Sequence, residues 1–129
     1  YSDMRGNSVP RVPEYTAFGT TTYNWNIGED MGAFIRLDAN YFGKTYTEER
    51  NLNWMKSYTI FNLRGGIETD AYRLELFVTN LTDEDSWASG ARFSDTAFAT
   101  DFGNFFVEQG VNVSPNDKRE VGVRVQLRF

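Results

Sequence analysis

Cysteine and histidine are both missing from this sequence. The lack of cysteine excludes disulfide frameworks, thiolate metal sites and cysteine nucleophiles. The lack of histidine removes the side chain that most often serves as a general base or a zinc ligand near neutral pH. We therefore expect no enzyme: no catalytic residue, no metal site and no cofactor.

Basic residues and long apolar runs are scarce as well. Lys plus Arg number 13 against 18 Asp plus Glu, a formal net charge of -5, whereas nucleic-acid-binding domains normally carry a basic patch. No stretch approaches the roughly 18 consecutive apolar residues of a membrane-spanning helix. Nucleic acid is therefore not an expected partner, and only the alternating strands of a β-barrel could cross a membrane.

The length of 129 residues leaves room for one domain or for a piece of one. The chain opens on Tyr1 rather than methionine, and it shows no charged and then apolar leader. We therefore expect it to be part of a longer or processed protein.

Aromatic residues are plentiful, at 16% of the chain with 11 Phe, and apolar residues recur at every second position, the period of a β-strand. Five segments show this alternation: residues 14–26, 31–43, 58–67, 71–81 and 121–129. The last is the clearest, because its odd-numbered positions are all apolar: Val121, Val123, Val125, Leu127 and Phe129. Each strand should therefore have one apolar and one polar face.

Short and long connections between these strands take turns along the chain. Residues 27–30 and 68–70 are rich in Gly, Asp and Thr, as hairpin turns require. Residues 44–57 and 82–117 form much longer links, and weak alternation at 91–100 and 105–107 indicates a small hairpin in the second. In a meander this order places all short turns at one end of the sheet, as in outer-membrane barrels.

These features predict an all-β fold, an antiparallel up-and-down meander of about five strands that forms an incomplete wall of a transmembrane β-barrel. A strand of about 10 residues that rises about 3.3 Å per residue and tilts by about 40° spans the apolar band of such barrels. Both edge strands should lack partners, and an isolated sheet of this kind should aggregate in water.

A barrel wall also predicts which side chains contact lipid. Rings near strand ends suit the aromatic girdles at the two membrane interfaces: Tyr15, Trp25, Tyr41, Tyr58, Tyr72 and Phe129. The membrane-facing residues are expected to be Ile35, Leu37, Tyr41, Phe61, Leu63, Leu74, Leu76, Val78, Val121, Val123, Val125 and Leu127.

Several short motifs occur in a fixed order along most of the chain. They are Gly6-Asn7 with Pro10 and Pro13, Arg36-Leu37-Asp38 with Tyr41, Gly43 and Tyr46, Tyr58 with Asn62-Leu63-Arg64, the run 76–84, and the run from Arg119 to Phe129. In this order they resemble the C-terminal β-barrel segment of TonB-dependent outer-membrane receptors. Asn-Leu-Thr-Asp-Glu at 80–84 and the terminal Phe129 are the most specific pieces. One position departs from the family, because Lys118 rather than proline precedes Arg119.

The resemblance implies a location and a function. Residues 1–129 would be the C-terminal portion of a receptor barrel in the outer membrane of a Gram-negative bacterium, with no plug domain in this sequence. The receptor would import a siderophore, a cobalamin-like cofactor or an oligosaccharide, energised by TonB through the missing N-terminal part. Its other partners would be outer-membrane lipid, the rest of its own barrel and plug, and the barrel-assembly machinery, for which the strand ending in Phe129 resembles the recognition signal.

Loop residues and charges complete the set of predicted sites. A ligand at the loops would contact exposed rings and amides: Trp54, Trp87, Phe102, Asn104 and Phe105. We interpret the acidic run 83–85, and Glu48, Glu49 and Arg50, as solvated loop charge rather than a calcium site. Charged residues on the polar strand faces should pair across strands rather than touch substrate: Arg36, Asp38, Arg64, Arg73, Glu75, Arg124 and Arg128.

The alternation also fits a protein of another class. A soluble antiparallel β-sandwich or small barrel could bury the same apolar faces against a second sheet and bind a sugar or an apolar ligand. Alternation alone does not separate burial in lipid from burial in a core.

Overall fold

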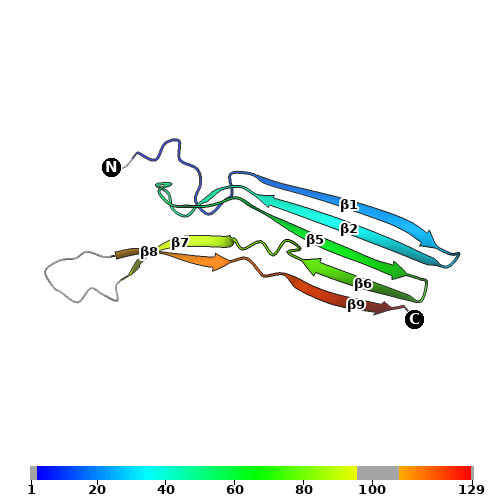
Figure 1. Cartoon of the computed structure of the whole chain (residues 1–129). Coiled ribbons are helices and arrows are strands. Elements are labelled where there is room, and N and C mark those ends of the chain that lie inside the picture. Colours follow the sequence, from blue (N-terminus) through cyan, green and yellow to red (C-terminus); the bar gives the residue numbers. More distant parts are fainter. Residues whose placement is uncertain (1–2, 96–107, 129) are drawn as a thin grey trace. The chain divides into compact units, whose positions relative to one another are not determined.

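The computed structural model describes residues 3–95 and 108–128. These residues form β-strands, turns and loops, with no helix among them, and they divide into two compact units. The larger unit is a five-stranded antiparallel sheet in the order β1-β2-β5-β6-β9 (Figure 1). Its strands are β1 (Thr16–Ile27), β2 (Met31–Phe42), β5 (Tyr58–Glu68), β6 (Tyr72–Thr79) and β9 (Glu120–Leu127).

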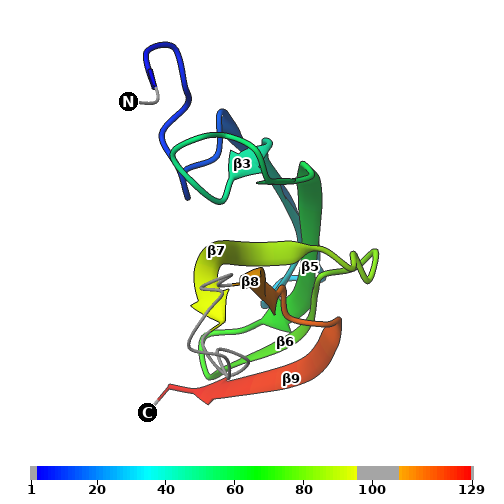
Figure 2. The same ribbon diagram turned by 90° about the vertical axis from the view of Figure 1, so that its left-hand side faces the viewer.

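The predicted meander is confirmed. All five strands occur in the expected order, and no boundary differs from its prediction by more than two residues. Figure 2 shows successive strands of this sheet stepping round an arc. None of the described residues belongs to a helix with the length and apolar character needed to span a bilayer.

The two tight turns lie at one end of the sheet, as expected from the chain order (Figure 1). Gly28 in the turn after β1 has a φ of 71°, a left-handed conformation that glycine adopts without strain. In the turn after β5, the Thr69 hydroxyl accepts hydrogen bonds from the backbone N–H groups of Ala71 (3.3 Å) and Tyr72 (3.2 Å). The long connections leave the sheet at its opposite end.

The register places residues of one chemical kind side by side across all five strands. Partners directly opposite each other in a ladder share a face of the sheet. Three rows of such partners run across the apolar face: Trp25–Ala33–Ile67–Leu74–Val125, Tyr23–Ile35–Gly65–Leu76–Val123, and Thr21–Leu37–Leu63–Val78–Val121. The alternate residues, which include most of the strand charges, form the opposite face.

The smaller unit contains two hairpins and the N-terminal segment. One hairpin pairs β3 (Thr45–Tyr46) with β4 (Trp54–Met55), and the other pairs β7 (Trp87–Asp95) with β8 (Glu108–Pro115). The backbone N–H of Arg11 donates to the carbonyl of Tyr46 (2.7 Å), which fastens the N-terminal segment to β3.

Both hairpins correct the sequence analysis. Strands β3 and β4 were not expected, because two residues are too few to show alternation. The second hairpin was expected, but β7 begins at Trp87 rather than at residue 91, and β8 continues to Pro115. The strand expectations for residues 96–100 and 105–107 lie outside the described residues.

A pair of residues on the polar face joins β6 to β9. Phe77 and Gly122 are directly opposite in the ladder, and a side chain built at Gly122 would overlap the Phe77 ring. The ring therefore lies over the space that the glycine leaves open.

We predict that Gly122→Ala destabilises the sheet by about 1–3 kcal/mol, the usual cost of overpacking. Gly19→Ala is the matched control, because nothing lies within 4 Å of a Cβ at that position. The measurement is the urea midpoint of the intact protein in its native environment. Equal midpoints for the two variants would contradict the role assigned to the Phe77–Gly122 pair.

Candidate functional site: a sheet with one apolar and one charged face

The apolar face of the sheet is exposed in the described structure. All twelve residues expected to face the membrane lie on this one face by register. Nine of them are exposed large apolar side chains, from 37% for Leu74 to 71% for Val121. Because each such side chain gains about 1.5–3 kcal/mol on burial, leaving nine in water would forgo on the order of 10 kcal/mol. That is comparable to the whole stability of a domain, so this face needs a cover.

Aromatic residues occupy both ends of the apolar face. Near the tight turns, the rings of Tyr23 and Trp25 stack with centroids 5.5 Å apart, and Tyr72 opens β6. Toward the other end, Phe61 and Tyr41 lie on the same face. Rings thus lie near both ends of the apolar face.

Three of the rings assigned to girdles lie on the polar face, before β1 or outside the described residues. Tyr58 is directly opposite Phe42 on the polar face, with ring centroids 4.9 Å apart, so its assignment to a girdle was wrong. Tyr15 precedes β1. Phe129, also predicted as the barrel-assembly signal, lies outside the described residues.

The polar face buries two of its carboxylates, Asp38 and Glu75. Asp38 on β2 is 7% exposed; it contacts the Arg36 guanidinium at 2.8 Å and accepts a hydrogen bond from the Thr20 hydroxyl at 2.7 Å. Arg64 on β5 approaches the same carboxylate at 3.9 Å. This cluster connects β1, β2 and β5.

Glu75 forms the second cluster, between β6 and β9. It is 5% exposed, and its two oxygens contact Arg73 at 3.2 Å and Arg124 at 3.1 Å. Glu68 on β5 also forms ion pairs with two arginines, Arg73 at 3.3 Å and Arg128 at 3.9 Å. The predicted pairing across strands is therefore confirmed for Arg64, Arg73, Arg124 and Arg128, whereas the Arg36–Asp38 and Arg73–Glu75 pairs lie within single strands.

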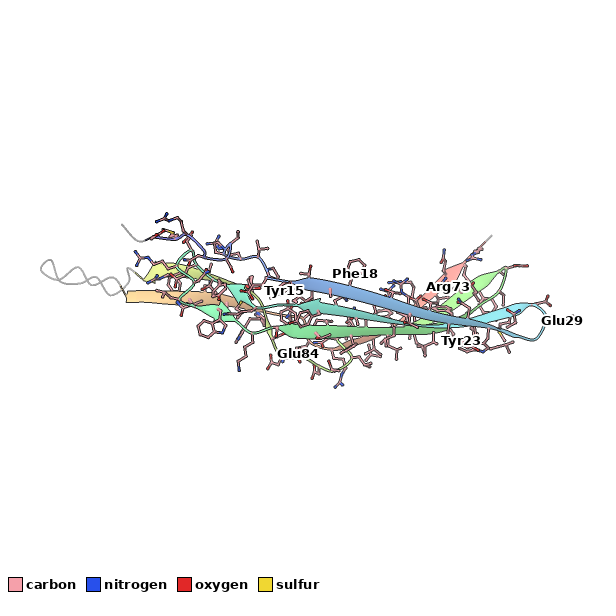
Figure 3. All side chains as sticks on the ribbon, turned by 90° about the horizontal axis from the view of Figure 1, so that it is seen from above. Tyr15, Phe18, Tyr23, Glu29, Arg73 and Glu84 are labelled. Carbon is pink, nitrogen blue, oxygen red and sulfur yellow. The ribbon has the colours of Figure 1, made fainter. Side chains whose placement is uncertain are left out.

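In this sheet many large apolar side chains are exposed while two carboxylates are buried, whereas a water-soluble domain usually has large apolar side chains inside and charges outside. Figure 3 shows side chains standing out on both sides of the sheet, with Arg73 from the polar face and Tyr23 from the apolar face. The buried apolar side chains among the described residues are Ala33, Phe34 and Met55.

The Asn-Leu-Thr-Asp-Glu run fastens the loop end of the sheet. Asn80 has a φ of 48° and is 3% exposed. Its side-chain NH2 donates to the carbonyls of Glu84 (3.1 Å) and Asp117 (3.0 Å), and its side-chain oxygen accepts from the Glu84 N–H (2.8 Å). Its own backbone N–H donates to the Asn62 side chain (3.0 Å). These hydrogen bonds hold Asn80 at the point where the chain leaves β6.

Asp83 of this run and the neighbouring Asp85 both contact the segment that leads into β9. Asp83 has a φ of 54°, and its carboxylate accepts from the backbone N–H of Arg119 at 3.1 Å. Asp85 forms an exposed ion pair with Lys118 at 3.1 Å. Asp83 and Asp85 are exposed, as expected of solvated loop charge. Together these contacts connect the exit of β6 to the segment that leads into β9.

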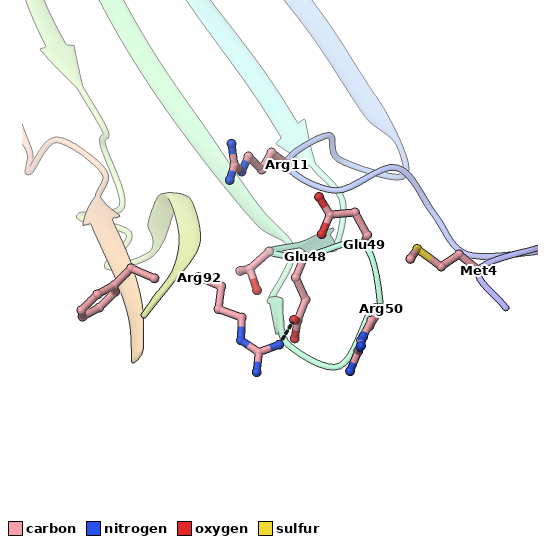
Figure 4. Close-up of a pocket in the computed structure, with 8 residues that line it drawn as sticks. Met4, Arg11, Glu48, Glu49, Arg50 and Arg92 are labelled. Carbon is pink, nitrogen blue, oxygen red and sulfur yellow. Dashed lines mark hydrogen bonds and ion pairs between the residues drawn. The ribbon is translucent and has the colours of Figure 1, made fainter. Parts of the chain in front are cut away.

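The smaller unit holds an open cavity of about 490 Å³ (Figure 4). It is lined by Met4, Arg11, Thr47, Glu48, Glu49, Arg50, Arg92 and Phe93. Glu48 is only 6% exposed, because it forms an ion pair with Arg92 of β7 and accepts a hydrogen bond from the Asn53 side chain at 2.9 Å.

The interpretation of Glu48 as solvated charge was wrong, whereas Glu49 and Arg50 are exposed. Glu48 and Arg92 are 44 positions apart. No local pattern marks such a pair, so the sequence analysis missed Arg92.

The predicted ligand residues are partly described. Trp54 on β4 is 56% exposed, with the Lys44 ammonium 4.8 Å from its ring centroid, and Trp87 at the start of β7 is 49% exposed. Both belong to the smaller unit, yet neither lines the cavity described above. Phe102, Asn104 and Phe105 lie outside the described residues.

No family model matches the chain, and no solved structure matches it at a significant level. The arrangement of the two sheet faces is therefore the main ground for a functional argument.

We predict that Asn80→Leu lowers the stability of the sheet by about 3 kcal/mol, since it removes several buried hydrogen bonds and leaves their partners without a hydrogen bond. Asn80→Gly should lower the stability less than Asn80→Leu does. Both variants lose the side-chain hydrogen bonds, but glycine adopts the positive φ without strain. Asn24→Ala on the exposed strand β1 is the control. Urea unfolding of the intact protein measures all three, and a neutral Asn80→Leu would contradict the fastening role.

We also predict that Glu48→Gln loosens the smaller unit, because it removes the charge that balances half-buried Arg92. Limited proteolysis of the intact protein should cut faster within residues 43–57 and 86–116. Glu49→Gln makes the same chemical change at the exposed neighbouring residue, so it should leave the cleavage rate unchanged. Faster cleavage in both variants would point to net charge rather than to the ion pair.

Proposed function

We propose that residues 1–129 are the C-terminal portion of a TonB-dependent receptor and form part of its transmembrane β-barrel in the outer membrane of a Gram-negative bacterium. One observation carries this proposal. A largely apolar face that extends across five strands is exposed, while Asp38 and Glu75 on the opposite face are buried. A barrel wall needs this order, with lipid outside and a polar lumen inside.

Strand lengths support the proposal. β1 and β2 each have 12 residues. At about 3.3 Å per residue and a tilt of about 40°, such a strand crosses roughly 30 Å, enough for the apolar band of an outer-membrane barrel. The rings of Trp25 and Tyr41 then lie near opposite interfaces.

The connections support it as well. Tight turns join β1 to β2 and β5 to β6, and much longer segments leave the other end of the sheet. Outer-membrane barrels have short periplasmic turns and long external loops. In this proposal the long connections are the external loops, and their residues Trp54, Trp87, Phe102, Asn104 and Phe105 are the candidates for ligand contact.

The edges of the sheet fit a larger assembly. Within the described residues, the outer edges of β1 and β9 have no strand partner. Unpaired edges invite aggregation unless another strand covers them. In our proposal, strands from the rest of the receptor cover both edges, and the assembly machinery first recognises the terminal strand that ends in Phe129.

The activity that follows is TonB-energised import of a siderophore, a cobalamin-like cofactor or an oligosaccharide. It rests on the resemblance of the ordered motifs described above. This chain would supply the wall and external loops, while the plug and the TonB contact would come from the rest of the receptor.

A labelling experiment tests the proposal, and the absence of native cysteine gives this chain no labelling background. Spin labels are placed at Val123→Cys and Val125→Cys on the apolar face, and at Gln126→Cys on the polar face, in the intact protein in membranes. The first two should be more accessible to oxygen than to a water-soluble nickel chelate, and Gln126→Cys should show the reverse.

The alternative of a soluble sandwich or small barrel that binds a sugar or apolar ligand makes the opposite prediction. A second sheet would cover Val123 and Val125, so labels there would be immobile and inaccessible to both reagents. Cell fractionation with an antibody against residues 86–116 gives an independent result. A heat-modifiable outer-membrane band much heavier than this chain supports the receptor, and a soluble band rejects it.

A further inference from the structure

The polar face of the sheet contains a hollow with an excess of guanidinium groups. The hollow has a volume of about 220 Å³ and is lined by Arg64, Arg73, Glu75, Arg124 and Gln126. Three positive side chains stand against one carboxylate in this lining. The local charge is therefore positive although the chain as a whole is acidic.

Glu75 leaves most of the arginine donors unused. Its two oxygens each take one guanidinium, Arg73 at 3.2 Å and Arg124 at 3.1 Å, and its side chain is only 6% exposed. A guanidinium presents five N–H donors. Even with Glu68 at 3.3 Å from Arg73, donors remain for a further acceptor.

Arg64 is the least satisfied of the three arginines. Among the described residues its ion-pair partner is Asp38, at 3.9 Å. That carboxylate already contacts Arg36 at 2.8 Å and accepts a hydrogen bond from Thr20 at 2.7 Å. Arg64 therefore has capacity for another negatively charged group.

Two of the arginines are held in place by aromatic rings. The Arg73 guanidinium lies 4.3 Å from the centroid of Phe34, and that of Arg124 lies 5.5 Å from the centroid of Phe77. Such cation–π contacts fix the planar group without using its N–H donors. The donors thus need little reordering to bind a ligand.

Gly66 lets β5 and β6 approach closely beside Glu75. Gly66 is directly opposite both Phe34 and Glu75 in the ladders, so this position on the polar face carries no side chain. A Cβ at Gly66 would collide with the carbonyl oxygen of Leu74. The close approach of the β6 backbone therefore requires glycine on β5 directly opposite Glu75.

We propose that this hollow binds an oxyanion, a carboxylate or phosphate group, through Arg64, Arg73 and Arg124, with the Gln126 amide as an additional donor. Planar and tetrahedral oxyanions match the paired N–H donors of arginine. The net charge of the lining disfavours a cation. This inference concerns the polar face alone and goes beyond the proposed function, which rests on the apolar face.

The oxyanion has two possible sources, and the first arm of the test detects a free anion. Inorganic phosphate is titrated into the intact protein at constant ionic strength, and binding is followed by calorimetry. Arg64→Gln and Arg124→Gln should each weaken binding on the order of tenfold, as expected for a lost charge-assisted hydrogen bond. Arg119→Gln, an exposed substitution with the same change of charge, should leave binding unchanged.

The second arm detects a carboxylate from another segment of the same protein. Arg64→Lys places an amine at the hollow, and a zero-length carbodiimide reagent then joins it to a nearby carboxylate. Mass spectrometry should find a cross-link from position 64 to an Asp or Glu outside the described residues, and none from Arg119→Lys. Neutralising that acid should allow phosphate to bind.

The two arms decide the inference together. Phosphate binding that depends on Arg64 supports a free anion, and a specific cross-link supports an internal carboxylate. If phosphate binding is absent or insensitive to Arg64→Gln, and no specific cross-link forms, the inference is wrong. Arg64 is 42% exposed in its side chain, so its substitution should not prevent folding, and the spin-label result at Val123 reports separately on the proposed function.

Discussion

The register of the five strands is the constraint on which the rest of the structure depends. A slip of one residue between neighbouring strands would move every side chain to the opposite face. Glu75 would then lie among leucines and valines, and Leu76 would interrupt the arginine cluster. Three local features hold the register: the Thr69 turn between β5 and β6, the Phe77–Gly122 pair between β6 and β9, and the hydrogen bonds of Asn80. Each acts at a different point of the same two ladders.

The buried ion pairs and the exposed apolar face are two consequences of this register. Carboxylates such as Asp38 are costly to remove from water unless charged partners surround them, and Asp38 has Arg36 of its own strand and Arg64 of the neighbouring strand as partners. The apolar side chains have no such compensation within the described chain, because their favourable free energy comes only from leaving water. The charged face can satisfy itself, whereas the apolar face depends on its surroundings. The apolar face therefore needs a cover that the described residues do not supply.

The sequence predicted the sheet well because its signals are local. Period-two alternation located the strands, and the turn residues of 27–30 and 68–70 marked the two tight turns, whereas β6 ends two residues before its predicted end at 81. Tyr58 could also have been placed correctly, since it is an odd number of positions from Phe61 and so belongs to the opposite face. The pair of Glu48 with Arg92 could not be predicted, because partners 44 residues apart meet only through the fold of two separate loops. Residues too few to alternate, as in β3 and β4, give no signal either.

The arginine hollow shows how one set of residues can serve both stability and binding. Gly122 makes room for the Phe77 ring, that ring supports Arg124, and Arg124 in turn balances Glu75. These contacts would be needed in any sheet that buries Glu75. Arg64 differs, because its 3.9 Å approach to a carboxylate that is already satisfied contributes little to the sheet. A side chain with a small structural role, next to donors that are fixed in position, is better explained by a ligand than by the fold.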